Sequence, residues 1–124
     1  VTHEACITKS EILELINSKG KVTNMCGEII NYYFKLEKVD KNEMTPIHDA
    51  CSIMYLINPE IFDYKYMQVD VDCSEGLNRG MTVADTRDWI KYDNYNTKVL
   101  LNVDRDVFSK ILLDAIYKLD REVI

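Results

Sequence analysis

Apolar residues recur at intervals of three and four in two stretches near the start of the chain, which is the period of an amphipathic helix. In the first stretch, Thr8 and Glu11 have the spacing of a capping box, and apolar residues follow until Gly20. The second stretch, residues 22–36, keeps the same rhythm. We therefore expect a short helix that begins after Thr8 and a longer one that ends near residue 36.

The clearest helical pattern lies near the end of the chain, in residues 107–119. Its apolar positions form one continuous stripe, and polar residues occupy the opposite face. An aspartate just before a helix can accept hydrogen bonds from free backbone N–H groups, so either Asp104 or Asp106 would cap it. The sequence thus predicts a C-terminal amphipathic helix.

The middle of the chain carries a different kind of apolar segment. Residues 37–45 are polar and predict a surface loop that leads to Pro46, a residue suited to the first turn of a helix. Residues 47–57 are apolar on nearly all sides, and Pro59 would end a helix there. We therefore expect a helix that is buried all round.

Strand patterns follow this helix. Apolar and polar residues alternate over residues 66–73, with a turn at 74–76, and residues 81–84 and 99–103 are two further strand candidates. The predicted class is mixed α/β: helices, then a few strands, then a C-terminal helix. With 124 residues the chain is expected to form a single unit, 1–124.

Charge and composition exclude several classes of protein. A net charge of −6 argues against the backbone of a nucleic acid or an anionic membrane surface as the main partner. No apolar run approaches the roughly 20 residues of a membrane span. The composition, 47% hydrophobic and 29% charged, is that of a globular protein.

The four cysteines lie far apart and form no C-x-x-C pair. We interpret them as reduced, buried thiols of a cytoplasmic protein; a disulfide pair is the less favoured alternative.

His48 and Asp49 are two ionisable residues at the start of the apolar helix. Burial of an ionised carboxylate would require a compensating partner for Asp49. The simpler interpretation is a carboxylate at a helix N-terminus, stabilised by the helix dipole by about 0.3–1 kcal/mol. The alternative is a hard-cation ligand at Asp49 and a proton donor at His48. The spacing alone favours the first.

Three sequence segments, which occur in the order found in a known family, favour the second interpretation of His48 and Asp49. "VTHEACITKSEI" at 1–12, "IHDACSIMYLINPEIF" at 47–62 and "VDVDCSEGLNRGMTVAD" at 69–85 together resemble the C-terminal part of the inosine-uridine preferring nucleoside hydrolases. The resemblance implies a C-terminal fragment of that α/β fold. His3 resembles a position with a structural role, and we assign it no catalytic one.

Enzymes of this family hydrolyse the N-glycosidic bond of ribonucleosides with a calcium ion held by aspartates. The resemblance implies that Asp49 is a Ca²⁺ ligand and that His48 protonates the leaving base, a role that favours pyrimidine or mixed specificity. Tyr32 and Tyr33 correspond to aromatic residues that close over the base, although packing is the simpler role for both. Periodicity places Tyr33 on the apolar face and leaves Tyr32 freer.

The family's aspartate-rich motif, Asp-x-Asp-x-x-x-Asp-Asp, is absent, and the sequence begins with Val1. One carboxylate cannot hold Ca²⁺, which takes six to eight oxygen ligands. We therefore expect a fragment that neither retains calcium nor cleaves nucleosides alone, and whose complete enzyme is a cytoplasmic homo-oligomer acting on ribonucleosides. The alternative is a non-catalytic interaction or scaffold module derived from the same fold, marked by an exposed apolar patch.

Overall fold

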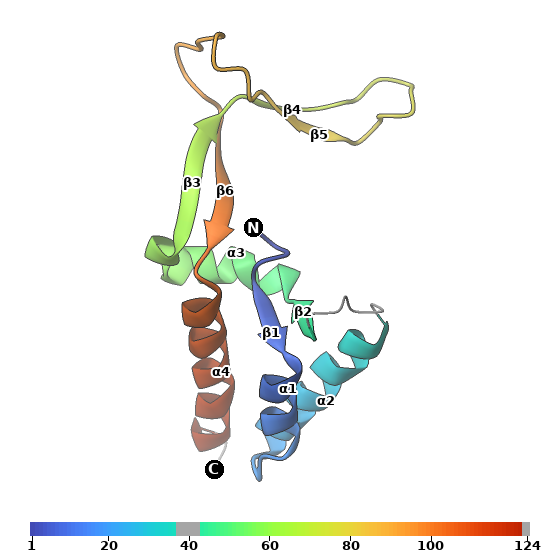
Figure 1. Cartoon of the computed structure of the whole chain (residues 1–124), viewed down its shortest axis with the longest axis vertical. Coiled ribbons are helices and arrows are strands. Elements are labelled where there is room, and N and C mark those ends of the chain that lie inside the picture. The colour runs from blue at the N-terminus through green and yellow to red at the C-terminus, as the bar shows by residue number, and fades with distance from the viewer. Residues whose placement is uncertain (37–42, 123–124) are drawn as a thin grey trace. The chain divides into compact units, whose positions relative to one another are not determined.

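The computed structural model describes residues 1–36 and 43–122 (Figure 1). The chain forms two compact units, which are treated separately below. Unit 1 comprises Val1–Phe62 and Asn102–Ile124, and unit 2 comprises Asp63–Leu101. Helices and strands both occur, which confirms the mixed α/β class. Among the described residues, no helix has the length and apolar character that a bilayer span requires.

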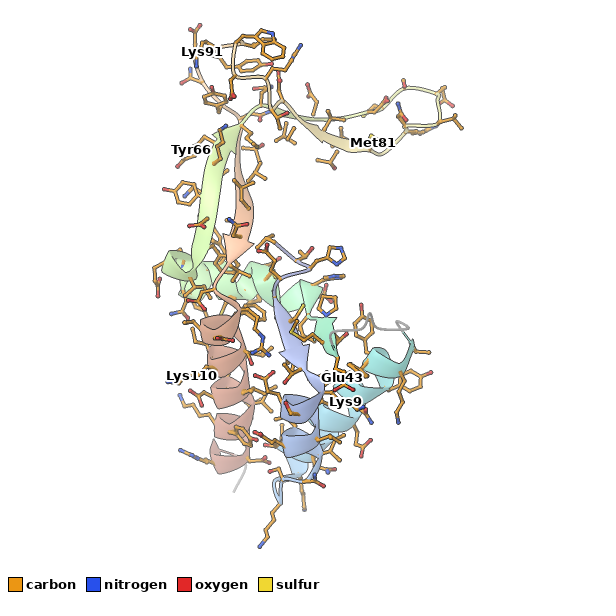
Figure 2. All side chains as sticks on the ribbon, viewed as in Figure 1. Lys9, Glu43, Tyr66, Met81, Lys91 and Lys110 are labelled. Carbon is orange, nitrogen blue, oxygen red and sulfur yellow. The ribbon has the colours of Figure 1, made fainter. Side chains whose placement is uncertain are left out.

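Unit 1 contains the helices and one small sheet. Strands β1 and β2 pair antiparallel, with Cys6 opposite Pro46 and Thr8 opposite Met44. Lys9 and Glu43 extend this pairing beyond the strands through a backbone hydrogen bond and an ion pair of 3.3 Å between Nζ and Oε1 (Figure 2). The elements in chain order are β1 (Cys6–Thr8), α1 (Lys9–Ile16), α2 (Lys21–Leu36), β2 (Met44–Pro46), α3 (His48–Ile57), a short 3-10 helix (Pro59–Ile61) and α4 (Arg105–Glu122).

The start of α1 has the predicted capping box. The Glu11 N–H donates to Thr8 Oγ1 at 3.2 Å, and the Thr8 N–H donates to Glu11 Oε2 at 2.7 Å. At the start of α4, the Val107 N–H donates to Asp104 Oδ1 at 3.1 Å, so Asp104 is the cap. Helices α1, α2 and α4 confirm the three predicted helices. The core of unit 1 includes Ile7 of β1, Ile12 and Leu15 of α1, and Phe108 and Ile116 of α4. Helix α2 contributes Thr23 and Gly27, whereas its apolar residues Met25 and Ile29 are exposed.

Helix α2 packs closely against α1 and α4 at two glycines. A Cβ at Gly27 would lie 2.7 Å from the backbone nitrogen of Ile16, so only glycine allows α1 and α2 to approach this closely. At Gly20 a Cβ would collide with the Asp120 carboxylate. That carboxylate accepts hydrogen bonds from the N–H groups of Val22 and Thr23, at 2.8 and 3.0 Å. A side chain of α4 therefore caps α2.

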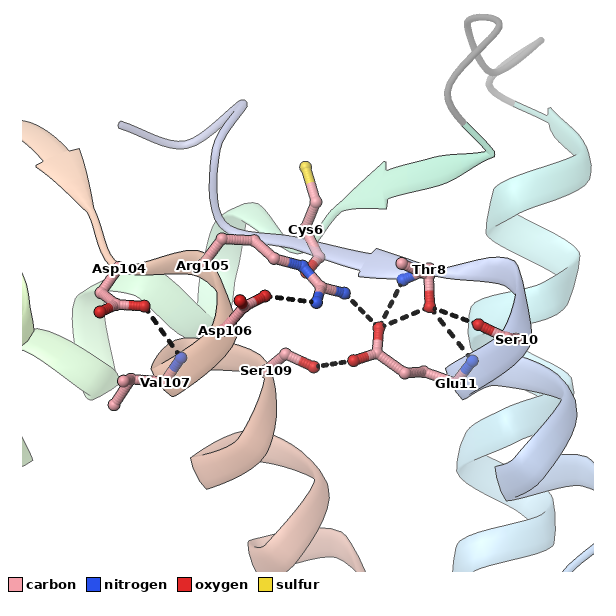
Figure 3. Close-up of polar contacts among 9 residues, drawn as sticks. All are labelled: Cys6, Thr8, Ser10, Glu11, Asp104, Arg105, Asp106, Val107 and Ser109. Atoms are coloured by element: carbon pink, nitrogen blue, oxygen red, sulfur yellow. Dashed lines mark hydrogen bonds and ion pairs between the residues drawn. The ribbon is translucent and has the colours of Figure 1, made fainter.

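A polar cluster joins β1, α1 and α4 around Glu11 (Figure 3). Glu11 Oε1 accepts a hydrogen bond of 2.5 Å from the Ser109 hydroxyl, and Oε2 pairs with the Arg105 guanidinium. Arg105 also donates from Nε to the Cys6 carbonyl at 3.1 Å. Burial alone would raise the pKa of Glu11, but the hydrogen bonds from Ser109, Thr8 and Arg105 outweigh it and lower the pKa.

Two sequence predictions around α3 are wrong. Pro46 does not open the helix: it is the last residue of β2, and α3 begins at His48. The helix is not buried all round either, because Cys51 and Met54 are buried whereas Ile53, Leu56 and Ile57 are exposed. The sequence shows that a helix is apolar but not which neighbours cover it. Most of the predicted loop, residues 37–42, lies outside the described residues.

Unit 2 is built from two pairs of strands. Strand β3 (Phe62–Met67) pairs with β6 (Thr97–Val103), and β4 (Val69–Val71) pairs antiparallel with β5 (Thr82–Ala84). Strands β4, β5 and β6 confirm three predicted strands. The expected strand at 66–73 was too long, because Tyr66 and Met67 belong to β3 and β4 runs only from Val69 to Val71. Strand β3 was missed because its residues 63–66 are all exposed and show no alternation.

The outer edge of β4 is occupied by a side chain. Asn96 accepts a hydrogen bond from the Val69 N–H at 2.9 Å and donates one to the Val69 carbonyl at 2.8 Å. The neighbouring residue Gln68 directs its carbonyl the other way, to the Asp85 N–H at 2.8 Å. The carboxamide of Asn96 thus takes the place of a third strand at Val69.

No disulfide joins any of the four cysteines, in agreement with the preferred interpretation. Cys6 and Cys51 are buried, but Cys73 is exposed, so the expectation that all four are buried is wrong. Cys73 lies just after β4, where the alternating pattern has ended.

Candidate functional site

The position of α3 is set by the sheet of unit 1. The Ile47 N–H donates to the Ala5 carbonyl at 2.8 Å, which continues the β1–β2 pairing by one residue beyond Pro46. The next residue, His48, is the first of α3. Thr45 and Ala5 are fully buried, so the junction between β2 and α3 is held against the core. His48 and Asp49 follow this junction directly and are exposed at the surface.

His48 and Asp49 line a hollow of about 340 Å³ between the start of α3 and one face of α2. Its other walls are apolar or aromatic. The hollow therefore combines an imidazole and a carboxylate with a hydrophobic lining. The residues that line it are Ile29, Ile30, Tyr33, Pro46, Ile47, His48 and Asp49.

The two tyrosines of α2 differ in their relation to this hollow. Tyr33 lines it, and its side chain is 37% exposed. Tyr32 is 67% exposed and does not line it. Tyr32 is thus the freer residue, as periodicity indicated, but Tyr33 is a wall of the hollow and not a fully buried core residue.

His48 contacts a second histidine that the sequence did not assign to the site. The rings of His3 and His48 meet edge to face, with centroids 5.4 Å apart and planes inclined at 78°. The segment that carries His3 is a tight turn closed by hydrogen bonds from the N–H groups of Glu4 and Ala5 to the Val1 carbonyl, at 2.9 and 3.2 Å. No spacing rule could have found this pair, because the turn and α3 are far apart in sequence.

Asp49 lies in the first turn of α3 and is exposed. The expectation that burial forces a partner on its carboxylate is therefore wrong, because water solvates the group. Its position suits both interpretations, a carboxylate facing the helix dipole or a ligand open to a cation. Within the described part of the chain, no group of three or more His, Cys, Asp or Glu side chains could hold a metal ion.

Unit 2 contains a polar cluster of its own that the sequence did not predict. Arg87 donates from Nε and Nη2 to the Asp85 carboxylate at 2.8 and 2.6 Å, and the Tyr92 hydroxyl donates to it at 2.5 Å. The hydrogen bonds from Arg87 and Tyr92 hold the pKa of Asp85 well below its ordinary value. The bond to Asp85 raises the pKa of Tyr92. Since its charges are already paired, we interpret this cluster as structural.

Comparison with known proteins gives consistent matches. The sequence model of the inosine-uridine preferring nucleoside hydrolases matches residues 1–110. A Leishmania major protein, inosine-uridine preferring nucleoside hydrolase, is 26% identical over 96% of this chain and 38% of its own length. A pyrimidine-specific ribonucleoside hydrolase of Shewanella is 30% identical over 94% of this chain and 37% of its own.

A solved structure shares the fold. The purine-preferring ribonucleoside hydrolase from Gardnerella vaginalis superposes with a TM-score of 0.82 and 18% identity, over 98% of this chain and 39% of that one. The chain thus spans little more than a third of the length of the relatives that it matches. Because the family's sequence model matches residues 1–110 of the 124, the chain belongs to the inosine-uridine preferring nucleoside hydrolase family.

Proposed function

We propose that this chain forms one wall of the active site of a ribonucleoside hydrolase, which cleaves the N-glycosidic bond to give ribose and free base. One observation carries the proposal: His48, Asp49 and Tyr33 line the same hollow, although Tyr33 comes from a different helix. The names of the relatives support the substrate class, because those compared above are nucleoside or ribonucleoside hydrolases.

His48 would act on the leaving base. Cleavage of a glycosidic bond passes through an oxocarbenium-like transition state, and a departing base is a better leaving group when it receives a proton. His48 is exposed at the mouth of the hollow, so a bound base could reach its imidazole. An imidazole at that position is the kind of side chain that most often serves as a general acid in enzymes.

Asp49 would contribute one carboxylate ligand to a calcium ion in the complete enzyme. An oxygen donor in an exposed position is the right ligand type, but Ca²⁺ takes six to eight oxygens. The described residues offer no metal-binding cluster, so they do not by themselves fit a calcium site. We therefore expect the 124-residue chain alone neither to retain Ca²⁺ nor to cleave nucleosides.

Tyr33 is better placed than Tyr32 to contact the base, because it lines the hollow together with the two ionisable residues and Tyr32 does not. An aromatic ring can stack on any nucleobase, so this contact would not select among bases. A proton donor at His48 favours pyrimidine or mixed specificity. The Shewanella relative is named for pyrimidine nucleosides and the Gardnerella one for purine nucleosides.

The second candidate function is a non-catalytic interaction module of the same fold. The exposed apolar residues of α3 favour it, because such residues suit a protein contact. For the hydrolase we further propose a cytoplasmic location, consistent with four cysteines that form no disulfide, and a homo-oligomer.

The test is hydrolysis of uridine and inosine by the 124-residue chain and by the longest natural polypeptide that contains it, each with calcium and with chelator. We expect activity only in the longer, calcium-loaded protein. In that protein His48→Ala should lower uridine turnover by about 100-fold or more, the scale of general acid catalysis. Ser52→Ala, at an exposed position of the same helix, is the matched control.

Two results would contradict the proposal. No hydrolysis by either protein would favour the interaction module. Unchanged uridine turnover in His48→Ala would remove the proton-donor role, even if the longer protein is an enzyme.

A further inference from the structure

The imidazole of His48 needs a neighbour to fix its orientation, because the residue is exposed at the first position of α3. A histidine side chain rotates about two bonds, and only some of its rotamers direct a ring nitrogen into the hollow. Within residues 1–36 and 43–122, no hydrogen bond or ion pair holds this imidazole. In the same part of the chain, its ring contacts that of His3.

The contact between the two rings is directional. Their centroids are 5.4 Å apart and their planes are inclined at 78°, which is the edge-to-face arrangement that aromatic rings favour. A rotation of His48 about either side-chain bond would lose this arrangement. The His3 ring therefore favours one orientation of the His48 ring over the others.

His3 can have this effect only if its own backbone is held in place. Its carbonyl accepts a hydrogen bond of 2.9 Å from the thiol of Cys6, which is buried. The next residue, Glu4, accepts a hydrogen bond of 3.3 Å at Oε2 from the Val103 N–H. The turn that carries His3 is thus tied to the core and to a segment from the far end of the sequence.

The sheet of unit 1 also sets the separation between the two histidines. The Ile47 N–H donates to the Ala5 carbonyl at 2.8 Å, and His48 follows Ile47 directly. His3 lies just before Ala5 on the other chain segment of this pairing. The same backbone hydrogen bond therefore holds both ends of the ring contact together.

His3 does not line the hollow, whereas His48 and Asp49 do. A base bound in the hollow would meet the imidazole of His48 and not that of His3. Any effect of His3 on a bound base therefore passes through His48.

We propose that His3 is a positioning residue, whose ring holds the imidazole of His48 in the orientation that directs a ring nitrogen to the departing base. This inference deepens the proposed function and rests on the proton-donor role given there to His48. It requires no proton on His3, because the contact acts through the shape and packing of the ring. A phenyl ring should therefore replace His3, and a polar side chain without a ring should not.

NMR spectroscopy of the 124-residue chain tests the contact without catalysis. We expect nuclear Overhauser effects between the ring protons of His3 and His48, because the centroids are 5.4 Å apart. His3→Gln removes the ring, so the coupling constants that report the rotamer of His48 should become averaged. In His3→Phe they should keep the values of the original chain.

Kinetics of the longest natural polypeptide that contains the chain, loaded with calcium, test the catalytic consequence. His3→Gln should lower kcat for uridine roughly 2- to 12-fold, the factor that corresponds to the energy of one aromatic pair. KM should not change, because His3 does not line the hollow. His3→Phe should restore kcat. Thr2→Ala, in the same turn, is the matched control and should match the original protein.

A second substrate separates positioning from a general loss of structure. The leaving group of 4-nitrophenyl β-D-riboside departs as a stable anion and needs no proton from the enzyme. For this substrate, kcat of His3→Gln should equal that of the original protein. Damage to the fold of the site would lower kcat for both substrates alike.

Four results would overturn the inference: no Overhauser effect between the rings, an unchanged His48 rotamer in His3→Gln, an unchanged kcat for uridine in that variant, or an equal loss with both substrates. A His3→Phe protein as impaired as His3→Gln would also contradict it, because the ring nitrogens and not the packing would then matter.

His48→Ala distinguishes failure of this inference from failure of the proposed function. Unchanged uridine turnover in His48→Ala, or no hydrolysis by the longer protein, would contradict both. A steep loss in His48→Ala combined with full activity in His3→Gln would contradict the positioning role alone.

Discussion

Glu11 and Arg105 are separated by most of the chain, yet their side chains form an ion pair between the first turn of α1 and the first residue of α4. Both are largely shielded from water, with side-chain exposures of 20% and 26%. Glu11 also takes part in the capping box of α1, and Arg105 reaches the carbonyl of Cys6 in β1. One carboxylate therefore joins three elements of unit 1.

Replacement of this carboxylate should destabilise the fold. Glu11→Gln keeps the size of the side chain but removes the charge, so the Arg105 guanidinium loses its partner on α1. Loss of one partner from a shielded hydrogen-bonding group costs about 1–3 kcal/mol, and we expect a loss of that size in the free energy of unfolding. Urea denaturation would measure it. Glu14→Gln, at an exposed position of the same helix, should change the unfolding energy by less than about 0.5 kcal/mol.

The stability of the chain should also depend on pH through Glu11. Its pKa in the folded protein lies below the ordinary value of 4.5. The unfolded state therefore binds the proton first, and the contribution of Glu11 to stability is present above pH 4.5 and is lost as the pH falls through the folded pKa.

Thermal unfolding of the original chain and of Glu11→Gln between pH 7 and pH 3 would test this dependence. The two curves should be separated at pH 7 and converge in acid. Asp120, whose pKa is lowered mainly by its hydrogen bond from Thr23, leaves some acid sensitivity in both proteins. A constant separation at every pH would contradict the role assigned to Glu11.

Gly27 should not tolerate even a methyl group. In an exposed helix, alanine is more favourable than glycine by about 0.8–1.0 kcal/mol. Here the added Cβ would lie 2.7 Å from the Ile16 nitrogen and 2.8 Å from the Leu15 Cβ, which are closer than atoms can pack. Overpacking costs about 1–3 kcal/mol, so Gly27→Ala should be destabilising overall.

The matched control is Gly76→Ala, because the nearest atom to a Cβ at that position is the Ser74 Oγ at 3.7 Å. Chemical denaturation of the two variants gives the comparison. A Gly27→Ala chain as stable as the original would mean that α1 and α2 separate at little cost.

The helices were the most predictable part of the fold, because their signals are local. Thr8 and Glu11 specify the start of α1 within four residues, and the repeats within α2 and α4 specify one apolar face each. Strands β1 and β2 were missed because each has three residues, too few to show alternation, and exists only through pairing with the other. The choice between Asp104 and Asp106 required the structure.

The site was predictable only in part. His48 and Asp49 could be named from the strings that carry the family resemblance, and both line one hollow with Tyr33. The contact between His3 and His48 could not be predicted from the sequence, because it depends on how the turn at the start of the chain lies against α3. The exposure of Ile53, Leu56 and Ile57 on α3 was also unpredictable, because an apolar pattern does not show which neighbours cover the helix.

The side chain of Asn96 has a consequence for the association of this protein with itself. A sheet of only two strands presents open backbone groups, to which an extended segment of any other molecule can add. At Val69 both of these groups are already bonded to the Asn96 carboxamide. An added strand would therefore find no open backbone group at Val69, and the amide closes this position without a charge or a proline.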